Sequence, residues 1–149
     1  MNYNLLNEQL KALTDGVDDL ISNLANSCAL IYDALPDINW AGFYLLKNGV
    51  LVLGPFQGKP ACTKIEIGRG VCGTAVAMDA VQRVADVHSF AGHIACDSAS
   101  RSEIVVPLHK DGKIFGVLDI DSPSLNRFTR QDEQGLIAIA ETIEELLNR

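Results

Sequence analysis

Three of the four cysteines, Cys62, Cys72 and Cys96, lie in one stretch that is broken repeatedly by glycine. Disulfide frameworks belong to small secreted chains, whereas such a density of cysteine in an intracellular protein more often indicates redox catalysis or metal binding. The spacing of these residues therefore points to thiol chemistry.

Either Cys72 or Cys96 could be a nucleophile. Cys72 follows a Gly-Arg-Gly turn at the predicted start of a helix near residue 71, where the helix dipole and Arg69 would favour the thiolate. Cys96 lies in a small, polar segment, with His93 close enough in sequence to act as a cationic partner or proton source. Cys62 has a nearby lysine but no other distinguishing feature.

The cysteines have two other interpretations, as buried core residues and as metal ligands. Cys28 lies on the apolar stripe of a predicted helix, so we expect it to be a buried core residue. A zinc site has enough potential ligands, but the chain has no Cys-x-x-Cys pair, so we expect no metal site. Those ligands would be Cys62, Cys72, His88, His93 and Cys96.

A second group of candidate residues is acidic. The two-residue period of a strand over 113–120 places Asp119 and Asp121 on the face opposite Leu118 and Ile120. Two carboxylates at the end of an apolar strand need a cation, and a substrate ammonium group would serve. Glu103 opens the preceding strand and could join them. The alternative is a solvated strand end at which residues 121–123 begin a turn.

A third group is aromatic. Trp40, Gly42 and Tyr44 share one face of a strand predicted over 39–46. The two rings could form the wall of a small pocket, with the glycine leaving room for a ligand, or they could pack beneath a terminal helix.

The flanking segments predict the scaffold that positions these groups. Apolar residues recur at three- and four-residue steps over 5–35, which predicts two helices separated at Gly16. A further amphipathic helix is predicted over 128–147, with Thr129 as its N-cap.

Two hairpins lie between these helices. Residues 39–46 and 50–56 are joined by an Asn-Gly turn, and residues 103–109 and 113–120 by an Asp-Gly turn. The segment between the hairpins is irregular, with a short helix from about residue 71 and a brief strand within 82–87. This order predicts an α+β fold, an antiparallel sheet with the terminal helices packed on one face.

The composition limits the function further. At 149 residues and 48% hydrophobic, the chain is expected to form one domain. A net charge of −7 without basic clusters disfavours nucleic acid. The absence of a signal-peptide pattern and of a long apolar run predicts a cytoplasmic protein that does not bind a membrane.

Five segments together resemble the free methionine-(R)-sulfoxide reductases, a family of stand-alone GAF-domain enzymes. They are NWAGFYLL, LVLGPFQGKPAC, GRGVCGTA, DVHSFAGHIACDSASRSEIVVPL and GVLDIDSP, in the family's order from about Asn39 to Asp132. The resemblance implies a single GAF domain over 1–149. It also implies reduction of free methionine (R)-sulfoxide with electrons from thioredoxin, in a cycle of sulfenic acid and disulfide that needs no cofactor.

The resemblance also implies residue roles. Cys96 would attack the sulfoxide, Cys62 would resolve the sulfenic acid, and Cys72 is a third cysteine that can pair with Cys96. Local sequence alone favours Cys72 as nucleophile, so the roles of Cys72 and Cys96 stay open here. The acidic group, Glu103, Asp119 and Asp121, would hold the ammonium and supply the acid, and Trp40 and Tyr44 would bound the methyl and sulfoxide groups. Backbone N–H groups of residues 70–73 are candidates for binding the carboxylate.

The competing hypothesis is a ligand-sensing GAF module without catalysis. Such a sensor is expected to work with an output domain, and we find none in these 149 residues. The amphipathic N-terminal region could also support a homodimer.

Overall fold

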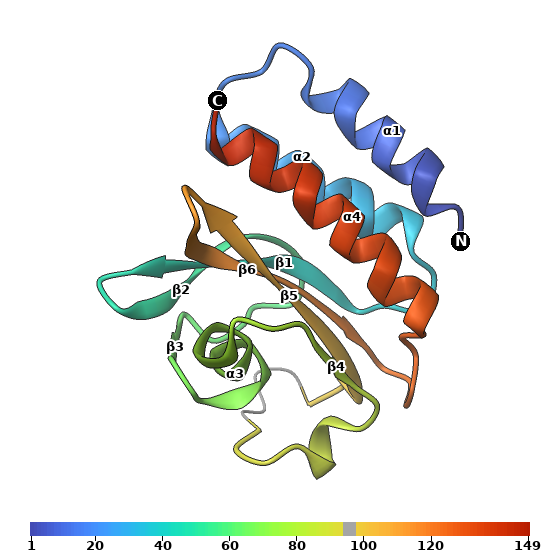
Figure 1. Ribbon diagram of the computed structural model, residues 1–149. Coiled ribbons are helices and arrows are strands. Elements are labelled where there is room, and N and C mark those ends of the chain that lie inside the picture. The colour runs from blue at the N-terminus through green and yellow to red at the C-terminus, as the bar shows by residue number, and fades with distance from the viewer. Residues whose placement is uncertain (94–97) are drawn as a thin grey trace.

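The computed structural model describes residues 1–93 and 98–149. Its six strands form one antiparallel sheet in the order β3-β2-β1-β6-β5-β4 (Figure 1). The strands are β1 (Trp40–Lys47), β2 (Val50–Gly58), β3 (Lys64–Glu66), β4 (Gln82–Val84), β5 (Ser102–Lys110) and β6 (Lys113–Ser122). The helices are α1 (Tyr3–Thr14), α2 (Leu20–Ala34), α3 (Gly70–Met78) and α4 (Arg130–Leu147), with a 3-10 turn η1 (Val87–Ser89).

The α+β fold is confirmed. The helices α1, α2 and α4 cover one face of the sheet, as predicted, while α3 packs on the other face (Figure 1). Each face has its own core because neighbouring residues of a strand point to opposite sides. On β1, Phe43 is buried with the terminal helices, and Trp40 and Tyr44 are buried with α3.

The turns explain why the two hairpins are predictable. Asn48 and Gly49 have φ of 53° and 79°, and Asp111 and Gly112 have φ of 53° and 76°. Positive φ at both central residues suits the twist of a tight hairpin, and Asn, Asp and Gly tolerate it best. The pair β1–β6 then joins the two hairpins at the centre of the sheet.

The strand predicted within 82–87 is shorter than expected. β4 ends at Val84, and η1 follows because the Asp86 side chain accepts a hydrogen bond from the His88 backbone N–H, which caps the turn. The long C-terminal helix begins as predicted, since Thr129 and Asp132 form a reciprocal capping box. No helix among the described residues is long and apolar enough to cross a membrane.

The end of β5 is tied to two helices through His109. Its Nδ1 lies 2.8 Å from Glu144 Oε2 on α4, and its Nε2 lies 2.7 Å from Asp79 Oδ1, the residue that caps α3. Burial lowers the pKa of His109, but the two carboxylates outweigh burial and raise it above its ordinary value. The imidazolium form is therefore favoured in the folded protein.

We expect His109→Gln to destabilise the protein at low pH more than at high pH. The raised pKa gives a stabilisation that is fully present below the ordinary histidine pKa of about 6.5 and is lost as pH rises through the folded-state pKa. Because the ring is partly exposed, the effect should be about 0.5–1 kcal/mol. Thermal denaturation of both proteins at pH 5.5 and pH 9 measures it, and an equal difference at the two pH values would show that only packing is lost.

Candidate active site

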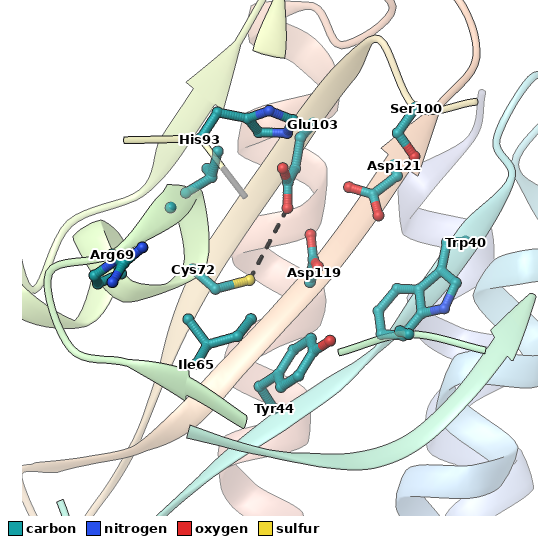
Figure 2. A pocket seen from close by; sticks show the side chains of 13 residues that line it. Trp40, Tyr44, Ile65, Arg69, Cys72, His93, Ser100, Glu103, Asp119 and Asp121 are labelled. Atoms are coloured by element: carbon teal, nitrogen blue, oxygen red, sulfur yellow. Dashed lines mark hydrogen bonds between the residues drawn. The ribbon is translucent and has the colours of Figure 1, made fainter. Parts of the chain in front are cut away.

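A small pocket opens on the face of the sheet that carries α3 (Figure 2). β1, β5 and β6 supply its floor, and α3 and the segment before β3 supply its walls. The described residues that line it are Trp40, Tyr44, Ala61, Ile65, Arg69, Gly70, Val71, Cys72, His93, Ser100, Glu103, Asp119 and Asp121. Of the eight site residues predicted from sequence, six therefore line one pocket.

Strand register brings the three carboxylates together. Glu103 on β5 pairs directly with Asp121 on β6, and Asp119 lies two residues before Asp121 on the same face. Figure 2 shows the three side chains pointing toward a common space beside the Cys72 sulfur. The Cys72 thiol donates a hydrogen bond to Glu103 Oε2 at 3.9 Å. The Cys72 sulfur and one carboxylate oxygen from each of Glu103 and Asp119 lie within 4.8 Å of one another.

Burial is the largest influence on the pKa of both Glu103 and Asp119 in the acidic cluster. Burial, followed by the charges of Asp119 and Asp121, raises the pKa of Glu103 well above its ordinary value. Burial also raises the pKa of Asp119, although hydrogen bonds from its neighbours oppose this. Asp119 is 4% exposed, and its Oδ1 has no hydrogen-bond partner among the described residues. A buried carboxylate oxygen in this state favours a ligand that brings a cation and N–H donors.

Cys72 is placed as predicted but not in the predicted ionisation state. It lies in the first turn of α3, close to the helix N-terminus. However, it is 3% exposed, and burial, followed by the charges of Asp119, Glu103 and Asp121, raises the pKa of its thiol well above the ordinary value. The expectation of a stabilised thiolate at Cys72 is therefore wrong, because desolvation and three carboxyl groups outweigh one helix end.

The other cysteines differ from Cys72. Cys28 is fully buried in the core between the terminal helices and the sheet, as expected, and burial raises its pKa to about 11. Cys62 is disulfide-bonded, whereas Cys28 and Cys72 are free. The predicted nucleophile Cys96 lies outside the described residues.

The aromatic residues form a wall of the pocket rather than packing beneath a terminal helix. Trp40 stacks on Tyr44 with ring centroids 5.9 Å apart and on Phe56 with centroids 5.2 Å apart. The sequence predicted that Gly42 would leave room for a ligand, but the space beside it is filled by Phe56 and Trp40. A Cβ there would meet Phe56 Cβ at 2.3 Å and the Trp40 ring at 2.8 Å, so the missing side chain makes room for this stack.

The structure alters two predictions, the positive charge of His93 and the backbone N–H groups available at residues 70–73. The pKa of His93 is lowered by burial and by His88, so the neutral ring is favoured and a cationic role is not supported. The Gly70 N–H donates to the Gly92 carbonyl, and the Gly73 N–H to the Arg69 carbonyl. The N–H groups of Val71 and Cys72 have no acceptor among the described residues, since the helix supplies none in its first turn, and they stay candidates for binding the carboxylate.

Sequence reasoning missed the contributions of Ser100 and Ile65 to the pocket. Ser100 is buried and accepts a hydrogen bond from the Asn39 side chain at 3.1 Å. Ile65 is the buried centre of the three-residue strand β3. Neither has a distinctive local motif, since each enters the pocket through pairing with elements distant in the chain.

Comparison with known proteins agrees with this architecture. The GAF domain family matches residues 10–147. The chain is 58% identical to the free methionine-R-sulfoxide reductase of Escherichia coli, over 97% of this chain and 88% of that protein. The reduced form of fRMsr of Staphylococcus aureus superimposes with a TM-score of 0.95 at 55% identity, over 98% of this chain and 95% of that one. The free methionine-R-sulfoxide reductase of Neisseria meningitidis, solved in complex with its substrate, gives a TM-score of 0.95 at 43% identity, over 98% and 88%.

The six-stranded antiparallel sheet, with three helices on one face and a pocket beneath α3 on the other, is that of a GAF domain. Within the GAF-domain class, sequence identity of 55–58% to these reductases over almost the whole chain identifies the family. The chain belongs to the free methionine-R-sulfoxide reductase family.

Proposed function

We propose that this protein reduces free methionine (R)-sulfoxide to methionine. The observation that carries the proposal is the buried cluster of Glu103, Asp119 and Asp121, which leaves an Asp119 oxygen without a partner among the described residues. A free amino acid brings the ammonium group that such a cluster needs, whereas a methionine within a protein has none. The cysteines of the chain would supply the reducing chemistry.

The first step would be an attack of the Cys96 thiolate on the sulfoxide sulfur. The sulfur–oxygen bond of the substrate breaks, the oxygen is transferred to the cysteine, and methionine and a cysteine sulfenic acid result. The departing oxygen needs a proton, and Glu103 is suited to supply it because burial raises its pKa and so favours the protonated carboxyl group. Asp119 and Asp121 would then hold the ammonium group.

Resolution of the sulfenic acid would use Cys62. The Cys62 sulfur attacks the sulfenic sulfur, a disulfide bond forms, and the hydroxyl group leaves as water with the thiol proton. Cys62 is disulfide-bonded in the structure while Cys28 and Cys72 are free, which supports Cys62 over Cys72 in this role. A dithiol protein of the thioredoxin class would return the disulfide to thiols by exchange, in the reducing cytoplasm.

The ammonium requirement gives the test. A coupled assay of thioredoxin oxidation should show turnover of free methionine (R)-sulfoxide, little turnover of the (S) epimer, and a loss in kcat/KM of about 10²–10³-fold for N-acetylmethionine (R)-sulfoxide, because a buried charge then lacks its partner. The C-terminal amide of the substrate is the matched control, since it keeps the ammonium group. Equal kcat/KM for the free and N-acetylated substrates would contradict the role of the carboxylates.

We also propose that the N-terminal helices mediate dimerisation. Leu5 and Leu13 on α1 and Ile21 on α2 are large apolar side chains that stay exposed in the single chain. A second copy would cover them.

A further inference from the structure

Two aromatic side chains of the pocket wall donate hydrogen bonds to the backbone of residues 59–63, the segment that carries Cys62. The Tyr44 hydroxyl donates a hydrogen bond to the Cys62 carbonyl oxygen at 2.8 Å. The Trp40 indole Nε1–H donates to the Lys59 carbonyl oxygen at 3.1 Å. Both rings come from β1 at the centre of the sheet, so a rigid element holds the segment from inside.

Close packing reinforces these two bonds. Gly58, the last residue of β2, has a φ of 128°, and a Cβ there would meet the Trp40 ring and the Asn39 carbonyl oxygen at 2.7 Å. The chain therefore turns tightly against Trp40 as it leaves β2. At the other end of the segment, the Leu53 N–H donates to the Thr63 carbonyl oxygen at 3.0 Å.

Much of the segment lies at the surface and outside any helix or strand. Lys59, Pro60 and Thr63 are exposed, and Ala61 and Cys62 are only partly buried. A short exposed loop without secondary structure pays a large entropic cost to hold one side chain in place. The hydrogen bonds from Tyr44 and Trp40 reduce the entropic cost of holding Cys62 in one position.

Tyr44 is a suitable donor for this purpose. Its side chain is buried, and burial together with the charges of Asp119 and other acidic neighbours raises the pKa of the phenol, so the hydroxyl keeps its proton. That one hydrogen is directed to the Cys62 carbonyl. It is therefore not directed to a substrate oxygen, which leaves the acid role to the carboxyl groups.

We propose that Tyr44 is a positioning residue for the resolving step, its hydroxyl holding Cys62 within reach of the sulfenic acid. This role rests on the proposed function and adds to the contact that Tyr44 would make with substrate. Attack of Cys62 on the sulfenic sulfur forms the disulfide and releases water, so the step needs no further reactant. Its rate depends on how often Cys62 reaches the attacking position.

The test separates resolution from the step before it. Reduced protein, freed of reductant, is mixed with excess methionine sulfoxide, and three quantities are followed: methionine released, sulfenic acid trapped by dimedone, and free thiols remaining. The rate constant for disulfide formation is taken after the methionine burst, so substrate affinity does not enter it. We expect Tyr44→Phe to lower this constant about fivefold, the factor that corresponds to one net hydrogen bond, and to increase the dimedone adduct. Trp40→Phe should act in the same direction.

Tyr3→Phe is the matched control. It also removes a tyrosine hydroxyl bond, from Tyr3 to Asp132 at 2.6 Å, but on the opposite face of the sheet. It should lower the melting temperature without changing the rate constant for disulfide formation. A Tyr44→Phe protein that forms its disulfide at the wild-type rate would overturn the inference. Absence of a methionine burst in the wild-type protein would instead overturn the proposed function.

Discussion

Replacing Cys96 with serine is expected to abolish methionine release in the first turnover, by at least about 10³-fold. Cys72→Ser is expected to retain a burst of one equivalent. The thiolate is the reacting form of a cysteine, and burial beside three carboxyl groups makes it scarce at Cys72. Cys28 is enclosed in the core on the other face of the sheet. Cys96 is the cysteine that remains for the attack once Cys62 is assigned to resolution.

Methionine released per enzyme, measured with reduced protein and no reductant, decides between the two cysteines. Cys28→Ser provides the control for a general effect of losing a thiol, and Cys62→Ser should keep the burst but stop steady turnover. A burst from Cys96→Ser together with none from Cys72→Ser would reverse the assigned roles.

The parts of this site that local periodicity determines were predictable. The alternation of a strand is enough to place Asp119 with Asp121 and Trp40 with Tyr44, and the pairing of β1 with β6 then brings both pairs to one face. The turn residues at 48–49 and 111–112 made the two hairpins predictable for the same local reason.

The environment of Cys72 was not predictable in this way. Its helix position is local, but its pKa depends on Glu103 and Asp119, which reach it from β5 and β6 only after the sheet has formed. Gly42 shows the same limit. Its role depends on Phe56, which the neighbouring strand brings against it, and no pattern within β1 reveals that contact.

The second large effect is expected from Asp119→Asn, which should lower activity while raising stability. The ammonium group of the substrate would lose a buried charge partner, and kcat/KM should fall by about 10²–10³-fold. In the protein without substrate, however, ionising Asp119 is unfavourable because burial raises its pKa. Asparagine removes that cost.

The pH dependence of the gain has a definite sign. A carboxyl group whose folded-state pKa is raised stabilises the fold most below its ordinary pKa of about 4, and this stabilisation is lost as pH rises towards the folded-state value. Asp119→Asn should therefore be more stable than the wild type at pH 8, by about 1–2 kcal/mol, with the advantage disappearing near pH 4. Urea denaturation at the two pH values measures this, and Asp33→Asn, at an exposed position on α2, controls for net charge. A loss of stability at pH 8 would mean that the carboxylate is already satisfied before substrate binds, and the cluster would then have no need of the ammonium group.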